Sequence, residues 1–173
     1  MFFELLGTIM AGVATALIFW AVNRSLKGRM PSWLMPVSAG AAMLLAAISL
    51  EYGWYDRTAR AMPQGFVVAQ TVEEKALYRP WTYAVPYTTR YVAVDQASRK
   101  THPDQPDQRI VDLWLYGRWS RPARVPVLFD CAQSRRAAIV DGIEFGDNGE
   151  VVGADWIAVG GADPILQTAC EGA

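Results

Sequence analysis

The chain has 173 residues, a formal net charge of −1 and 52% hydrophobic residues. One histidine and two cysteines are too few for a conventional zinc or haem site. The slightly acidic balance, without a basic stripe, argues against a nucleic-acid partner. We therefore expect a protein without enzymatic activity that binds no metal, no cofactor and no nucleic acid.

The first 54 residues are expected to form a hairpin of two membrane-spanning helices. Residues 5–22 and 33–50 contain no charged side chain, and a helix of this length rises about 27 Å, close to the thickness of a bilayer core. A cleaved signal peptide is the alternative for the first segment, but Glu4 stands where a signal peptide has basic residues. Neither segment holds an ionisable residue, so a lone transporter or channel is not expected.

Small residues recur every four positions in both apolar segments. They are Gly7, Ala11 and Thr15 in the first segment and Ser38, Ala42 and Ala46 in the second. Gly12 and Ala16 repeat in the same way on an adjoining stripe of the first segment. This spacing lets helix backbones approach closely within a membrane. Two interpretations remain open: the two helices pack on each other, or one of these seams faces a partner protein.

The connection between the two segments sets the expected orientation in the membrane. Residues 23–32 contain three basic residues and no acidic one, and the positive-inside rule places such a loop in the cytoplasm. In a bacterial inner membrane both termini then lie in the periplasm. Aromatic residues that suit the membrane boundaries stand near both ends of the second segment: Trp33, Tyr52, Trp54 and Tyr55.

Residues 55–88 are expected to form an irregular approach to the soluble head, because Pro80, Trp81 and Pro86 interrupt any regular pattern. Residues 89–173 contain several short segments in which apolar and polar side chains alternate, which predicts an antiparallel sheet of about five or six strands. This second region is expected to be the periplasmic domain.

Turn and cap signals complete the expected domain. Gly-Asp-Asn-Gly at positions 146–149 predicts a hairpin turn. Asp163 followed by Pro164 predicts the start of a short final helix. The fold class is therefore α+β: a two-helix transmembrane hairpin, then a small antiparallel domain that ends in a helix.

Among the aspartates of the head, four scattered ones are candidate acids, and the chain has no obvious catalytic set. They are Asp112, Asp130, Asp141 and Asp155. Paired acids can act on a glycosidic bond, but acids that alternate along strands commonly face water. We therefore expect no catalytic residue among them.

Both cysteines, Cys131 and Cys170, fall in the head. They lack the spacing of a metal site. In an oxidising compartment they predict one structural disulfide, which would pin the final helix to a strand. The alternative is a pair of free thiols in a cytosolic domain.

The same region carries a resemblance to a known family. The residues concerned are Phe129-Asp130-Cys131, Arg135-Arg136, Gly149, Trp156 and Cys170. Their order resembles the C-terminal half of surface-adhesin protein E-like domains, over about half of the chain. The resemblance implies an antiparallel sheet with a C-terminal helix held by a disulfide. Members of that family are typically exported lipoproteins that bind host matrix proteins, but this chain has a two-span anchor in place of the lipoprotein cysteine, so we carry over the fold alone.

Two functions fit these expectations. The first is an accessory or assembly subunit of a bacterial inner-membrane complex, with other integral membrane subunits and the lipid bilayer as its partners. The second is a periplasmic binding module that recognises a ligand or an envelope polymer through an aromatic face formed by Trp114, Trp119 and Trp156.

Overall fold

The computed structural model describes residues 2–139, 143–146, 148–149 and 151–171. The chain divides into two compact units, Met1–Arg57 and Thr58–Ala173. We call the first the hairpin and the second the head, and each is described by itself.

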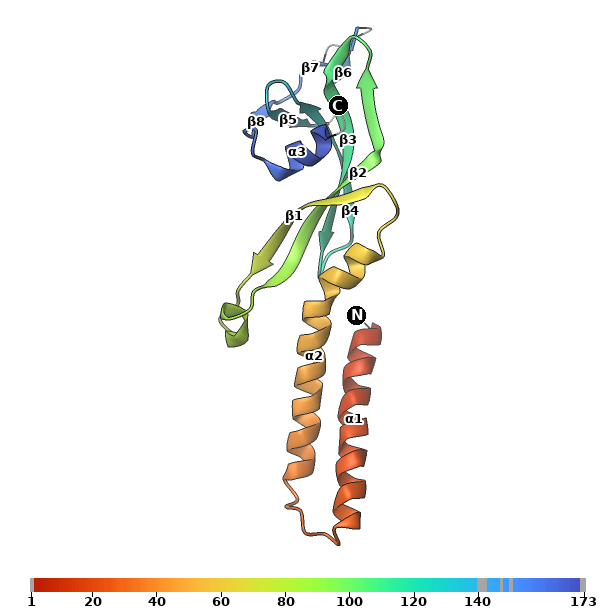
Figure 1. Ribbon diagram of the computed structural model, residues 1–173, viewed down its shortest axis with the longest axis vertical. Helices are drawn as coiled ribbons and strands as arrows, with labels where there is room; N and C mark the ends of the chain where they lie inside the picture. Colours follow the sequence, from red (N-terminus) through yellow and green to blue (C-terminus); the bar gives the residue numbers. More distant parts are fainter. Residues whose placement is uncertain (1, 140–142, 147, 150, 172–173) are drawn as a thin grey trace. The chain divides into compact units, whose positions relative to one another are not determined.

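The hairpin consists of two long helices, α1 (Phe2–Ser25) and α2 (Leu34–Arg60), that run antiparallel (Figure 1). The last turn of α1 closes on Asn23: its carbonyl accepts a hydrogen bond from the Gly28 amide (2.9 Å), and its side chain accepts one from the Met30 amide (3.1 Å). Gly28 has a φ of +76°, a conformation that glycine adopts without a steric penalty. The chain therefore reverses over a few residues, as the short basic connection predicts.

The head is built on one antiparallel sheet with the strand order β1-β2-β3-β4-β5-β8. The strands of this sheet are β1 (Phe66–Glu74), β2 (Tyr87–His102), β3 (Gln105–Gly117), β4 (Ala123–Asp130), β5 (Arg135–Ala138) and β8 (Ile157–Ala158). The remaining elements are a 3-10 turn (Pro80–Tyr83), a two-stranded ribbon of β6 (Glu144–Phe145) and β7 (Val151–Val152), and the final helix α3 (Pro164–Cys170). The predicted α+β fold is confirmed.

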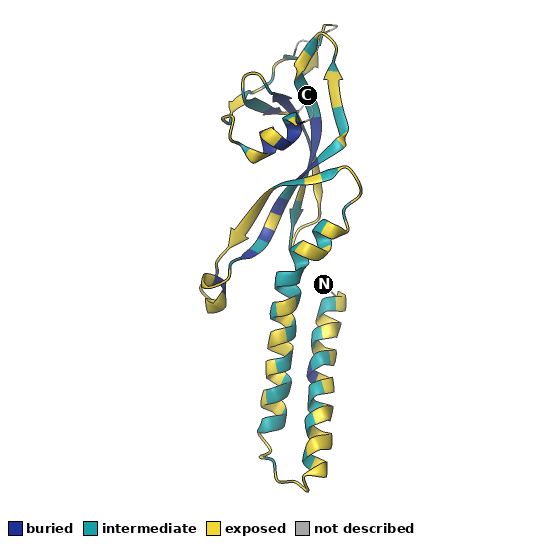
Figure 2. Cartoon of the chain, viewed as in Figure 1, coloured by how far each residue is buried: buried dark blue, intermediate teal, exposed yellow. Residues whose placement is uncertain are grey.

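The core of the head lies between α3 and one face of the sheet (Figures 1 and 2). Alternating residues of three neighbouring strands point to this face, and the apolar stripe of α3 packs on them. The buried members are Val94, Val111, Leu113, Val127, Phe129, Ile165, Leu166 and Ala169. The Asp163 carboxylate accepts hydrogen bonds from the Ile165 and Leu166 amides (3.0 and 2.9 Å), so the predicted N-cap of α3 is confirmed.

The opposite face of the sheet is lined by aromatic rings. Tyr91 is 1% exposed and stacks on its cross-strand partner Tyr116 with ring centroids 4.8 Å apart. Trp114 continues the row, 6.3 Å from Tyr116 and 5.9 Å from Phe66 of β1. Burial removes water from around the Tyr116 hydroxyl and raises the pKa of that group above its usual value.

The prediction that residues 55–88 form an irregular segment is wrong in two places. Helix α2 continues to Arg60, and β1 then pairs with β2 from Phe66↔Asp95 to Glu74↔Tyr87. The segment Phe66–Glu74 reads FVVAQTVEE, whose β-branched residues favour a strand even without strict alternation. The sheet therefore begins at residue 66 instead of 89.

The described residues of the hairpin turn predicted at 146–149 agree with that prediction, while Asp147 lies outside the described residues. The Gly149 amide donates to the Gly146 carbonyl (2.9 Å), and Phe145 pairs with Val151 beside it. The strands on either side are only two residues long, so this ribbon stands apart from the six-stranded sheet.

Candidate functional site

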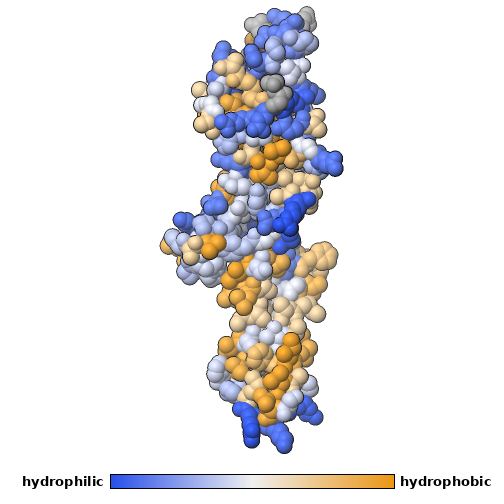
Figure 3. Space-filling view, in the orientation of Figure 1, coloured by the Kyte–Doolittle hydropathy of each residue, from blue (hydrophilic) through white to orange (hydrophobic). Residues whose placement is uncertain are grey.

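The hairpin presents its apolar side chains outwards. Gly12 is its only buried residue among those described in α1 and α2, and side chains such as Leu17 and Leu45 are 60% and 67% exposed (Figure 2). Both helices are long and apolar enough to cross a membrane. In Figure 3 the hairpin surface is mostly orange, and the deep blue side chains gather at the connection between the helices.

The predicted boundary aromatics sit at separations that suit a bilayer. Trp33 directly precedes α2, and Tyr52, Trp54 and Tyr55 lie on its last three turns. From Trp33 to Tyr52 the helix rises about 29 Å, close to the thickness of the hydrocarbon core. Trp33 is 60% exposed, whereas the other three side chains are half-buried.

The two helices meet at Gly12, which belongs to the adjoining stripe of small residues in the first helix. A Cβ at this position would lie 2.6 Å from Cγ of Met43 and 3.6 Å from the Ala39 carbonyl oxygen. A Cβ at Gly7 would have no neighbour within 4 Å, so Gly7 does not pack against the second helix, and the alternative that its seam faces a partner protein stays a prediction. The other predicted packing residues are half-buried: Ala11, Thr15, Ser38, Ala42 and Ala46.

The helical period explains why the contact is at Gly12 and not at Gly7. An α-helix has 3.6 residues per turn, so a spacing of four residues is slightly longer than one turn. Residues at this spacing therefore move gradually around the helix and do not all face the same neighbour, as with Gly7, Ala11 and Thr15. Gly12 belonged to the neighbouring stripe of small residues, and the absence of its side chain allows Met43 to enter the interface.

The predicted disulfide between Cys131 and Cys170 is present, with Cα atoms 5.9 Å apart. It joins the residue after β4 to the last residue of α3. Two side chains of the sheet also bind this helix by hydrogen bonds. Arg109 donates to the Cys170 carbonyl (2.9 Å), and the Gln96 side chain donates to the Thr168 carbonyl (2.6 Å). Helix α3 is therefore fixed to the sheet at its end by one covalent bond and two hydrogen bonds.

The three tryptophans of the predicted aromatic face do not lie together, so that face is not formed. Trp114 belongs to the aromatic row of β3 and pairs with Arg124 of β4. Trp156 lies against Arg135, whose guanidinium carbon is 4.2 Å from the ring centroid, and Arg135 pairs with Asp130. Along β4 the six residue steps from Arg124 to Asp130 span about 20 Å. Trp119 is in the loop after β3 and is 59% exposed.

A surface that sequence analysis missed lies where the β1–β2 and β3–β4 loops meet; we call it the aromatic end (residues 75–86 and 118–122). A recess of about 380 Å³ opens there, lined among others by Tyr78, Tyr87, Arg90, Arg118 and Trp119. The signal in the sequence was the cluster of aromatic residues between two prolines at 80 and 86. That cluster indicated an irregular loop but not its location.

A second recess, the aliphatic groove, lies on the α3 side of the sheet. It measures about 320 Å³ and has one charged side chain, Arg136, in its described lining. The other lining residues are Val92, Leu113, Leu115, Val127, Ala138, Ile157 and Ile165. Leu115 and Ile157 are 42% and 61% exposed, so α3 covers only part of this apolar face.

A third recess of about 220 Å³ lies between the β2–β3 hairpin and the β6–β7 ribbon and includes His102. The histidine Nδ1 accepts a hydrogen bond from the Asp104 amide (3.3 Å). Its ring packs under Gly149, where a Cβ would lie 2.7 Å from Cγ of the imidazole.

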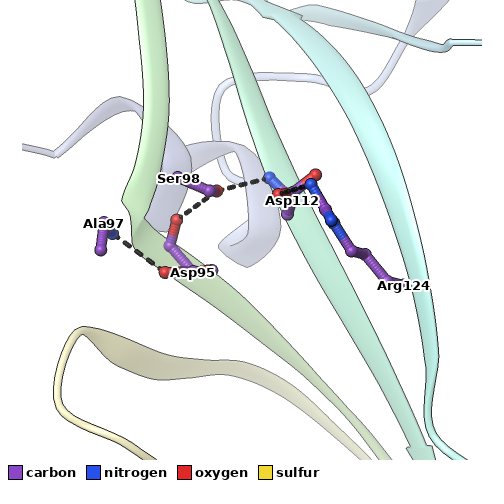
Figure 4. Close-up of polar contacts among 5 residues, drawn as sticks. All are labelled: Asp95, Ala97, Ser98, Asp112 and Arg124. Carbon is purple, nitrogen blue, oxygen red and sulfur yellow. Dashed lines mark hydrogen bonds and ion pairs between the residues drawn. The ribbon is translucent and has the colours of Figure 1, made fainter.

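Contrary to the prediction, Asp112 and Asp130 do not face water but are buried. The register of β2 shifts between Asp95 and Lys100, which forms a bulge. In this bulge Ser98 Oγ accepts a hydrogen bond from the Asp112 amide (2.9 Å), as Figure 4 shows. Asp112 is 7% exposed, and its carboxylate contacts Arg124 at 2.6 Å. Hydrogen bonding and the negative charge of Asp112 raise the pKa of the Arg124 guanidinium.

Asp130 has a comparable arrangement. It is 4% exposed, contacts Arg135 at 2.8 Å and accepts a hydrogen bond from the Gln133 amide (3.0 Å). Buried carboxylates with an arginine partner are typical of structural ion pairs. Asp155 is exposed, and Asp141 lies outside the described residues.

No family model, no curated protein and no solved structure matches this chain. The resemblance to surface-adhesin protein E-like domains therefore stays a prediction from short motifs.

Proposed function

We propose that the chain is a non-catalytic accessory or assembly subunit of a bacterial inner-membrane complex, anchored by its hairpin and carrying its head in the periplasm. One observation carries this proposal: the hairpin leaves nearly all of its apolar side chains uncovered. Exposed apolar surface of this extent is unfavourable in water, so lipid or other membrane helices must cover it.

The charges and the disulfide support the orientation. Arg24 in the last turn of α1 and Lys27 and Arg29 in the connection to α2 are all exposed, and three basic residues at this end of the hairpin favour the cytoplasmic side. The Cys131–Cys170 bond favours an oxidising compartment for the head.

Impermeant maleimide labelling of intact cells tests this orientation. Ser32→Cys in the connection should be protected until the inner membrane is permeabilised, whereas Val152→Cys in the head should label at once. The native cysteines should label only after reduction and denaturation. Labelling of Ser32→Cys together with protection of Val152→Cys would overturn the periplasmic assignment.

The aliphatic groove supports a protein partner for the head, because water disfavours an exposed apolar surface that includes Ile157. Gentle solubilisation, affinity purification and mass spectrometry should recover larger partners. Ile157→Asp should release them, and Val152→Asp, an equally exposed position outside the groove, should retain them. Recovery of the wild-type protein as a lone monomer under several gentle conditions would contradict the proposal.

A periplasmic binding module is the second candidate, supported by the size and lining of the same groove. Its volume of about 320 Å³ falls within the usual range of small-molecule pockets. Arg136 is the charged side chain of its aliphatic lining, and its guanidinium lies 3.9 Å from the Asp163 carboxylate, a distance at which a ligand anion can compete for it. These features suit an amphiphile with an anionic group. Native mass spectrometry should then show a retained small mass that Arg136→Gln weakens, and a bare protein mass after incubation with fatty acids would exclude this candidate.

A further inference from the structure

The aromatic end gathers exposed apolar side chains from two loops at one end of the sheet. Glu74 pairs with Tyr87 and Arg90 with Gly117, so the β1–β2 and β3–β4 loops leave the sheet side by side. The Arg118 amide donates to the Thr89 carbonyl (2.8 Å) and ties the second loop to β2. The exposed large residues of this end are Leu77 (88%), Tyr78 (76%), Trp119 (59%), Val85 (58%), Tyr83 (52%) and Trp81 (36%).

These side chains are presented by an ordered turn. Thr82 is 1% exposed, and its hydroxyl donates to the Arg79 carbonyl (2.7 Å) and accepts from the Ala76 amide (2.9 Å). The guanidinium carbon of Arg79 lies 5.3 Å from the ring centroid of Tyr78 and 5.6 Å from that of Tyr87. The loop is thus folded around a buried threonine and still directs its apolar side chains outwards.

The charge of this end differs from that of the remaining head. The aromatic end, residues 75–86 and 118–122, contains four basic residues and no acidic one, whereas the other residues of 58–173 contain eight basic and fourteen acidic ones. Aromatic rings mixed with basic side chains are typical of surfaces that lie in the headgroup layer of an anionic membrane. An acidic surface elsewhere disfavours the same contact for the rest of the head.

The chain keeps this surface near a membrane. Helix α2 ends at Arg60 and β1 begins at Phe66, a connection that spans at most about 20 Å. The nine residues of β1 add about 30 Å before the aromatic end begins. A tether of this length gives a high effective concentration, so even weak contacts with lipid are populated.

We propose that the aromatic end of the head lies in the headgroup layer of the anionic bilayer that the hairpin crosses. The inference rests on the proposed membrane anchoring and adds a second contact between this chain and lipid. The rings of Tyr78, Trp81 and Trp119 enter the interface, and Lys75 and Arg121 contact lipid phosphates.

Spin labels on the full-length chain in nanodiscs test this contact. Val85→Cys reports on the aromatic end, and Val152→Cys is its matched control, because the two valines are 58% and 56% exposed. In nanodiscs containing anionic lipid, we expect the ratio of oxygen to nickel-chelate accessibility to be several-fold higher for Val85→Cys than for Val152→Cys. Equal, water-like values for both labels would overturn the proposal.

A third label separates this inference from the proposed anchoring. Leu45→Cys on α2 should show lipid accessibility if the hairpin spans the bilayer. A water-like Leu45→Cys label would refute the anchoring itself, whereas a lipid-like Leu45→Cys with a water-like Val85→Cys would refute only the second contact. Dipolar broadening between Val85→Cys labels would assign the surface to a second copy and would also overturn the proposal.

Charge substitution tests the role of anionic lipid. Lys75→Gln with Arg121→Gln should lower the Val85→Cys ratio in anionic nanodiscs and have little effect in neutral ones. Lys100→Gln, an exposed lysine on β2 away from this end, is the control. Shielding of Val85→Cys only after addition of a soluble anionic polymer would assign the surface to that polymer and overturn the lipid contact.

Discussion

The hairpin and the head obtain their stability from different surroundings. The described head buries thirteen hydrophobic residues in its own fold, whereas the described hairpin buries only Gly12. The head also has a disulfide and ion pairs at buried aspartates. Internal packing therefore stabilises the head, and the hairpin depends on what covers it from outside.

This difference teaches how the two regions respond to substitution. In the head a buried side chain contacts other residues of the same chain, so truncation costs stability directly. In the hairpin most large side chains are exposed, so the contact between α1 and α2 rests on a few small residues. Substitutions can separate these two regimes in one full-length protein.

The largest expected effect is the loss of the disulfide. Cys131→Ser with Cys170→Ser should lower the free energy of unfolding of the head by about 4 kcal/mol, because the closed loop of 39 residues no longer restricts the unfolded chain. Urea unfolding of the detergent-solubilised protein, followed by tryptophan fluorescence, measures this change. The helical content of the hairpin should persist. An unchanged midpoint for the head would contradict the structural role of the bond.

A matched pair of leucines tests the internal packing of the head. Leu128 is 1% exposed, whereas Leu115 is 42% exposed. Leu128→Ala should lower the free energy of unfolding by about 3 kcal/mol, since it leaves a cavity, and Leu115→Ala by under about 1 kcal/mol. Equal losses in the same urea experiment would show that the sheet face around Leu128 is not packed as described.

A matched pair of glycines tests the hairpin. Gly12→Leu should force α1 and α2 apart by about 1–2 Å, because its side chain would meet Met43. Gly7→Leu should leave the separation unchanged, since nothing lies within 4 Å of a Cβ there. Spin-label distances between positions 5 and 45 measure the separation. A shift with Gly7→Leu alone would restore the original seam as the helix contact.

Sequence patterns predicted the order and type of the main elements better than the contacts between them. The two apolar segments, the capped final helix and the only pair of cysteines are strong local signals, and all three appear in the structure. The role of Gly12 as the helix contact was harder to predict, because a four-residue spacing does not say which of two adjoining stripes faces the other helix. That choice depends on the bulk of Met43 across the interface.

The candidate surfaces were harder to predict for a related reason. Strand register decides which loops share one end of the sheet, and register depends on pairings distant in sequence. Once β1 is placed beside β2, the aromatic loop at 75–86 and the loop of Trp119 become neighbours. The same register separates Trp114 from Trp156, so the predicted aromatic face is not formed.

The smallest expected effect concerns the aromatic row of the head. Burial raises the pKa of Tyr116, so its proton is held longer in the folded state than in the unfolded state. The unfolded phenol loses its proton near pH 10, and the free energy of unfolding should therefore be unaffected by Tyr116 below that pH and fall as the pH rises past it. Tyr116→Phe should make this alkaline decline shallower, as measured by urea unfolding between pH 8 and 11. The helical content of the hairpin, which lacks this aromatic row, should show no matching change over the same pH range. An identical decline of stability in the wild-type and Tyr116→Phe proteins would place the Tyr116 hydroxyl in water.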